Sequence, residues 1–74
     1  MLQAPDDAML RGVIVKLAAD RQLALDDSVV SYLVTRIERS FAAARAAVIA
    51  LDNEALRQRR APTRALAAEI LRDA

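Results

Sequence analysis

Apolar residues recur at three- and four-residue spacing in four separate segments of this 74-residue chain, and this periodicity restricts the fold more than any other feature. The segments cover about residues 5–21, 27–38, 41–58 and 63–72. No stretch has the alternating pattern of a β-strand, and the alanine-rich, glycine-poor composition favours helices throughout. We therefore predict an all-α fold, a compact four-helix bundle.

The apolar stripes also predict the core. A chain of this length holds one small hydrophobic core, so residues 1–74 are expected to form a single domain. Only 3% of the residues are aromatic, which makes Tyr32 and Phe41 the bulkiest side chains expected in or beside that core. In chain order, the stripes are Leu10, Val13, Ile14 and Leu17; Val29, Val30, Leu33, Val34 and Ile37; Phe41, Ala44, Val48, Leu51 and either Ala55 or Leu56; and Leu66, Ile70 and Leu71.

Residues suited to helix ends stand at the segment boundaries. Paired carboxylates at two predicted helix starts are explained by capping and by the helix dipole, and not by metal binding or acid–base chemistry. Gly12 lies inside the first segment, where it costs about 1 kcal/mol relative to alanine and indicates either a close backbone approach or a tolerated defect. The boundary residues are Pro5 in the first turn with Asp6 and Asp7, then Asp26 with Asp27, Ser40, and Pro62 followed by Thr63.

Composition excludes several kinds of chemistry. The chain has neither cysteine nor histidine, which removes disulfides, thiolate metal sites and imidazole catalysis. A phosphate-wrapping loop of glycines and lysine is also absent, so we assign no catalytic residue, no metal site and no cofactor to this chain itself. The net charge of +1 gives no general attraction to nucleic acid or membrane, and no apolar run is long enough to span a bilayer. Without an export signal at the acidic start, the expected location is the cytoplasm.

Several short motifs occur in an order that resembles one known family. They are Pro5 to Leu10, Leu17 to Arg21, Leu25-Asp26, Tyr32-Leu33, Thr35 to Ile37, Leu51-Asp52, Arg59 to Thr63 and Leu66 to Leu71. In order and spacing they resemble the helical lid subdomain of DnaA-family AAA+ proteins, over about residues 2–72. The stretch from Arg36 to Phe41, followed at a fixed interval by Leu51-Asp52, is more similar to the Hda group, short DnaA homologues that promote ATP hydrolysis by DnaA.

The resemblance implies a role within a larger protein that regulates the initiation of chromosome replication. A nucleotide-binding core subdomain of the parent would bind ATP or ADP, and residues 1–74 would form the lid that closes over the nucleotide. The expected partners are that core subdomain and DnaA. The fragment alone is expected to have no enzymatic activity.

The resemblance also implies a nucleotide contact that this sequence lacks. Lids of this family carry an arginine in the first turn of their third helix, where its guanidinium reads the nucleotide phosphates. The matching position here is Ala42. Arg39 and Arg45 flank it and are the candidates for contacting nucleotide, although a surface arginine beside a helix cap is more often a solvated charge or, here, a partner of Glu38.

A basic cluster near the end of the third segment is the strongest local charge feature. It comprises Arg57, Arg59, Arg60 and Arg64. These arginines either contact phosphate or an acidic partner, or complement the dipole at a helix C-terminus. Because aromatic residues for base stacking are scarce, direct DNA binding is not expected. Two alternatives to the lid remain, an independent helical DNA-binding module and a homo-oligomeric bundle that dimerises through an exposed apolar patch.

Overall fold

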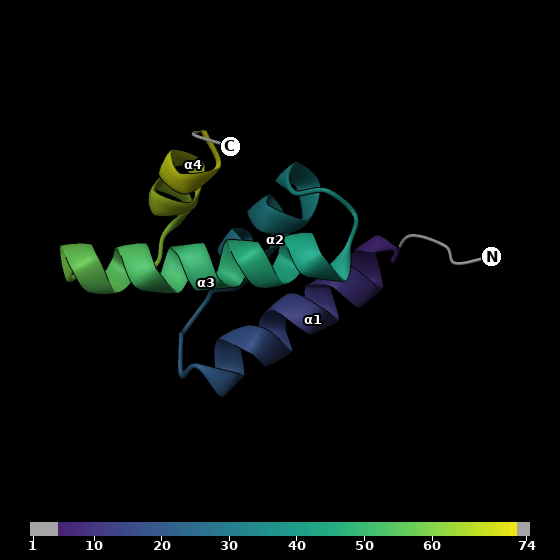
Figure 1. Ribbon diagram of the computed structural model, residues 1–74, viewed down its shortest axis with the longest axis horizontal. Coiled ribbons are helices and arrows are strands. Elements are labelled where there is room, and N and C mark those ends of the chain that lie inside the picture. The colour runs from purple at the N-terminus through teal and green to yellow at the C-terminus, as the bar shows by residue number, and fades with distance from the viewer. Residues whose placement is uncertain (1–4, 73–74) are drawn as a thin grey trace.

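The computed structural model describes residues 5–72, and every regular element in that range is an α-helix. The four helices are α1 (Asp7–Asp20), α2 (Asp27–Arg36), α3 (Phe41–Gln58) and α4 (Arg64–Arg72) (Figure 1). The predicted all-α four-helix fold is therefore confirmed. None of these helices is both long enough and apolar enough to cross a bilayer.

Side-chain oxygen atoms cap the N-terminus of every helix. Asp6 Oδ1 accepts from the Met9 amide at 2.8 Å, and Asp26 Oδ1 accepts from the Val29 amide at 3.1 Å. Hydroxyl groups cap the other two helices, at Ser40 for α3 and at Thr63 for α4. Each cap satisfies a backbone N–H group that has no partner within its own helix.

Two helix ends differ from the predicted boundaries by two residues. Pro5 does not lie in the first turn of α1, because Asp6 is the N-cap and the proline precedes it. The second helix stops at Arg36 and does not reach Glu38. Ile37 is extended there (φ −85°, ψ 161°), because the chain must turn before Ser40 can cap α3. The remaining differences are one residue, at the end of α1 and the start of α4.

Helices α1 and α3 both end in a left-handed residue that is not glycine. Gln22 has φ 57° and Arg59 has φ 55°. After α1, the Leu23 amide donates to the Ala18 carbonyl oxygen at 2.8 Å, and after α3 the Arg60 amide donates to that of Ala55 at 3.0 Å. These bonds form a Schellman motif, in which glycine usually occupies the left-handed position.

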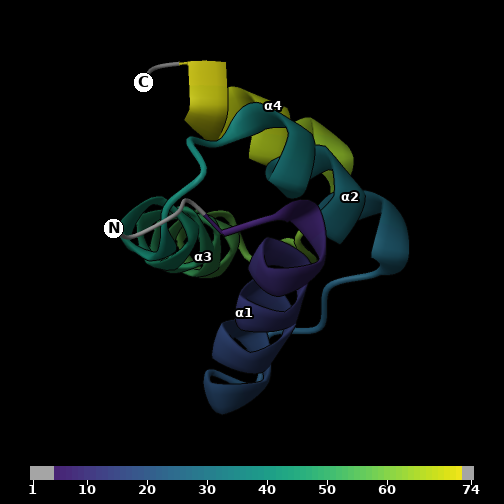
Figure 2. The ribbon, with the colours of Figure 1, turned by 90° about the vertical axis from the view of Figure 1, so that its right-hand side faces the viewer.

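Helix α3 is the central element. It packs against α1, α2 and α4, and α2 in turn packs against α1 and α4. Within the described residues α1 and α4 make no contact with each other and lie on different sides of α3, as the end-on view shows (Figure 2). Arg11 adds a polar link between α1 and α2, donating to Asp27 Oδ1 at 2.8 Å and to Ser31 Oγ at 2.6 Å.

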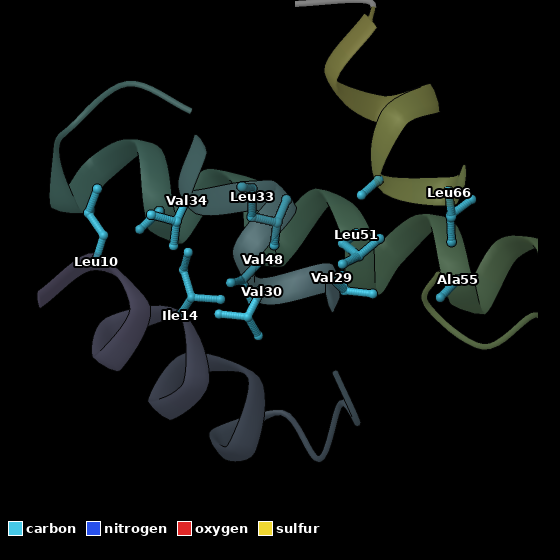
Figure 3. Close-up of a cluster of buried hydrophobic side chains, with 13 residues drawn as sticks. Leu10, Ile14, Val29, Val30, Leu33, Val34, Val48, Leu51, Ala55 and Leu66 are labelled. Atoms are coloured by element: carbon cyan, nitrogen blue, oxygen red, sulfur yellow. The ribbon is translucent and has the colours of Figure 1, made fainter. Parts of the chain in front are cut away.

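The core lies where the four apolar stripes meet (Figure 3). Leu10 and Ile14 from α1 point toward α2 and α3, and Leu66 reaches the same cluster from α4. The structure decides between the two predicted residues at the end of α3, since Ala55 is buried whereas Leu56 is 69% exposed. The other buried members are Val29, Val30, Leu33, Val34, Ala44, Ala47, Val48, Leu51 and Ala67.

Two expectations about individual residues are settled by their surroundings. Phe41 was expected in or beside the core, but its side chain is 49% exposed because it lies with Arg45 on a face of α3 other than the buried one. A Cβ atom added to Gly12 would meet no atom within 4 Å. Gly12 therefore marks no close backbone approach, and the tolerated-defect interpretation holds.

Candidate functional site

Arg39 lies at the N-terminal end of α3, one residue before the Ser40 cap. It forms an exposed ion pair with Asp7, in the first turn of α1, and not with Glu38. The pair ties the α2–α3 connection to the start of α1. An anion near this helix N-terminus would meet both the guanidinium group and the positive end of the helix dipole.

Arg45 lies one turn into α3 on a shallow apolar surface. This surface, called here the α3 face, consists of Phe41, Ala42, Arg45, Ala46 and Ile49. Among residues 5–72, no carboxylate lies within ion-pair distance of Arg45. Ala42, the position that corresponds to the missing phosphate-reading arginine, lies on the same face. The α3 face thus combines an apolar surface with one cation.

The four arginines of the predicted basic cluster lie in different environments. Arg57 is neutralised by Glu54, one turn earlier on α3, whose carboxylate also accepts from Gln58 Nε2 at 2.6 Å. The hydrogen bonds from Arg57 and Gln58 lower the pKa of Glu54 to about 2, and the same carboxylate raises the pKa of Arg57. Arg57 therefore stabilises its own helix through this ion pair.

Arg59 and Arg60 border a groove at the C-terminal end of α3. The groove has a volume of about 490 Å³ and also contains Leu56 and Pro62. Arg60 donates to Gln58 Oε1 at 2.8 Å and lies 3.8 Å from Glu69 of α4. No ion pair within the described part of the chain involves Arg59, which occupies the left-handed position.

Arg64 lies apart from this groove, beside Tyr32 of α2. Its guanidinium carbon is 5.8 Å from the centre of the Tyr32 ring, and that of Arg36 is 5.0 Å from the same point. Both distances fall within the range of cation–π attraction. Sequence reasoning placed Arg64 in the basic cluster and missed Arg36, because spacing along the chain does not show that α4 begins beside α2.

One partly buried ion pair was also missed. Arg21 Nε donates to Asp52 Oδ2 at 2.6 Å and joins the end of α1 to the middle of α3. The Asp52 side chain is 12% exposed and that of Arg21 is 38% exposed. Asp52 is the only buried charged residue in the part of the chain that the structure describes. A charged residue within an apolar stripe was the available signal, but its partner lies 31 positions away.

The arrangement offers binding groups and no reacting group. Within residues 5–72, no cluster of three or more acidic, histidine or cysteine side chains has the geometry of a metal site. Arginines are the recurring functional groups, and a guanidinium group binds oxyanions but remains protonated and is unsuited to proton transfer. The chemistry available is recognition of carboxylate or phosphate.

The comparisons with known proteins gave one match. The family model described as "Hda, lid domain" matches residues 6–71, which include all of α1, α2 and α3 and nearly all of α4. No curated protein and no solved structure matches the chain.

Proposed function

We propose, from the premise that this chain belongs to the Hda lid-domain family of DnaA-related AAA+ proteins, that it is the lid of a regulator of chromosome replication initiation in the cytoplasm. The observation that carries the proposal is the family match over residues 6–71. The absence of a phosphate-wrapping loop supports a division of labour, in which a separate core subdomain of the parent binds ATP or ADP. The lid has no turnover of its own in this proposal.

The surface proposed to dock on the core is the α3 face. An apolar helix surface that carries a single cation is suited to packing against another subdomain, because its alanines allow close approach. Phe41 supplies the largest apolar group on this face and is half exposed. Its exposure is costly for an isolated domain and is relieved when the core covers it.

Arg39 is the proposed nucleotide contact. It stands at the N-terminus of α3, and its exposed ion pair with Asp7 is weak enough for a phosphate group to replace it. Arg45 is assigned to the docking surface, one turn further along α3. DnaA is the proposed external partner, which the regulator as a whole stimulates to hydrolyse ATP.

The nucleotide assignment is tested in the full parent protein. Replacing Arg39 with alanine removes a charge-assisted hydrogen bond, so we expect ATP and ADP affinity measured by calorimetry to fall about tenfold. The matched control is Arg57→Ala, which removes an arginine already neutralised by Glu54. Equal affinities for both variants and the unchanged protein would refute the role of Arg39.

The lid assignment itself is tested by determining the gene sequence that precedes the codon for Leu2. A glycine-rich loop with lysine, placed between a strand and a helix, is expected there. The purified 74-residue chain should show no ATP hydrolysis above buffer and little nucleotide affinity. Turnover by the chain alone would overturn the division of labour between core and lid.

A further inference from the structure

An apolar groove runs between the end of α2, one side of α3 and α4. It has a volume of about 350 Å³, and its walls are mainly apolar. The side chains that matter here are Ile37 from the α2–α3 connection, Ala43, Ala47 and Ala50 from α3, and Ile70 and Leu71 from α4. The alanines give the groove its depth, because they leave room beside the α3 backbone for side chains of another molecule.

A basic clamp adjoins this groove. The clamp consists of Tyr32, Arg36 and Arg64, with both guanidinium groups held against the tyrosine ring. A second hollow of about 410 Å³ is lined by Tyr32, Arg36, Ala68 and Leu71. Arg36 and Leu71 line both hollows, so the groove is continuous with the Tyr32 and Arg36 side of the clamp, and Arg64 joins it through the Tyr32 ring.

The two arginines of the clamp carry charge that their surroundings do not neutralise. Neither takes part in an ion pair within residues 5–72. A ring held against a guanidinium group restricts its position but is a poor acceptor for its N–H donors, which stay available to an oxyanion. Two positioned cations beside an apolar groove are complementary to a carboxylate beside apolar side chains.

We propose that this combined surface binds a protein segment in which one or more carboxylates stand next to apolar side chains. The apolar side chains would enter the groove between α3 and α4, and the carboxylates would pair with Arg36, which lines the groove, and with Arg64 on the same tyrosine ring. This inference goes beyond the lid function, since it uses no nucleotide and the groove shares only Ala46 with the α3 face that docks on the core.

A protein segment fits this surface better than nucleic acid does. The groove has apolar walls, which offer little to a backbone of sugars and phosphates but bury the side chains of a peptide. The net charge of the chain, +1, also gives no long basic track of the kind that DNA requires.

The test is a selection from a random 16-residue peptide library on the immobilised 74-residue chain. We expect enriched peptides that place Asp or Glu beside two or more apolar residues. Their affinity, measured by fluorescence anisotropy, should fall about tenfold for Arg36→Gln and again for Arg64→Gln, because each loses a charge-assisted hydrogen bond. The charge-matched control is Lys16→Gln on α1, whose partner Asp20 is exposed, and it should bind like the unchanged chain.

Each other outcome overturns the proposal. The proposal is wrong if no peptide is enriched, or if the enriched peptides lack acidic residues. It is also wrong if the clamp variants bind the peptides as tightly as the unchanged chain. Melting curves of the variants check that each is still folded, which is expected because a cation–π contact at an exposed site contributes little to stability. A 20-nucleotide single strand or duplex that binds more tightly than the peptides, and loses affinity in the same variants, would assign the surface to nucleic acid instead.

Discussion

Two left-handed residues, Gln22 and Arg59, occupy positions where a helix-ending motif usually has glycine. An L-residue in this conformation brings its Cβ close to the following carbonyl oxygen, at a cost of about 1 kcal/mol. Gln22→Gly and Arg59→Gly should each relieve this cost and raise the melting temperature by about 4–8 °C. Thermal unfolding followed by circular dichroism measures the shift.

The matched control for these variants is Ala46→Gly, at an exposed position in the middle of α3. There glycine adds backbone freedom without relieving strain and should lower stability by about 1 kcal/mol. If all three variants lose stability alike, the left-handed assignment is wrong. If Arg59→Gly gains stability, the native arginine is retained for a reason other than folding.

Glu54 makes part of the stability depend on pH. Its pKa in the folded chain is about 2, against an ordinary value of 4.5, because Arg57 and Gln58 bind the charged form. The resulting stabilisation is fully present above about pH 4.5 and is lost as the pH falls toward about 2. Glu54→Gln should therefore flatten the decline in the free energy of unfolding across this interval.

Urea unfolding at several pH values checks this expectation. Asp26→Asn is a useful companion, because hydrogen bonds from Ser28 and Val29 also lower the pKa of Asp26, while asparagine preserves the cap. The double variant should be less sensitive to acid than either single variant. If the free energy of unfolding of Glu54→Gln declines at acid pH as steeply as that of the unchanged chain, the ion pair between Glu54 and Arg57 is contradicted.

Sequence reasoning at the residue scale succeeded where the cause is local. Asp6, Asp26, Ser40 and Thr63 could be identified as caps because a cap acts on an amide only a few residues away. Arg59 could not be recognised as left-handed, because the usual signal is a glycine and this chain has an arginine there. The environments of Arg36 and Arg64 depend on α2 and α4 meeting, which no local pattern specifies.

At the scale of the elements, the ion pair between Arg21 and Asp52 fixes how α1 lies against α3. Asp52→Ala leaves Arg21 without its partner in a half-buried position and removes a hydrogen bond of 2.6 Å between charged groups. We expect a loss of about 2 kcal/mol in the free energy of unfolding. A double-mutant cycle with Arg21→Ala should show strong coupling between these two residues.

The comparison for this cycle is the exposed pair of Glu54 and Arg57. Being exposed to solvent and salt, that pair should show a coupling energy of at most about 1 kcal/mol. Equal coupling in the two cycles would contradict the burial of Asp52. Raising the salt concentration should weaken the exposed pair more than the partly buried one.

The helices themselves were largely predictable, because their apolar stripes follow the 3.6-residue period of a helix. Predictions failed where packing and not periodicity decides, as at Phe41, which was counted in the buried stripe of α3 but lies on an exposed face with Arg45. The choice of Ala55 over Leu56 has the same cause. Periodicity locates the buried face of a helix to within about one residue. Packing against the neighbouring helix then decides which side chain is buried.

For the molecule as a whole, the family match assigns the chain to a lid domain, and the structure is the four-helix fold that the sequence predicted. Four short helices around one small core leave the α3 face, the groove beside α4 and the arginine-rich end of α3 at the surface. A small domain buries only part of its apolar surface. Exposed apolar surfaces are therefore expected in a subdomain that packs against a partner. The proposed functions divide these surfaces among different partners.

The most direct test of the lid assignment is a heteronuclear NMR titration of the isotope-labelled chain with the nucleotide-binding core of its parent protein. Docking through the α3 face predicts that chemical shifts change at Phe41, Ala42, Arg45, Ala46 and Ile49, with smaller changes on α1 beyond its first turn. Chemical shifts that stay constant across the titration, or that change only on the side of α1 that faces away from α3, would contradict the assignment of this chain as a docking lid.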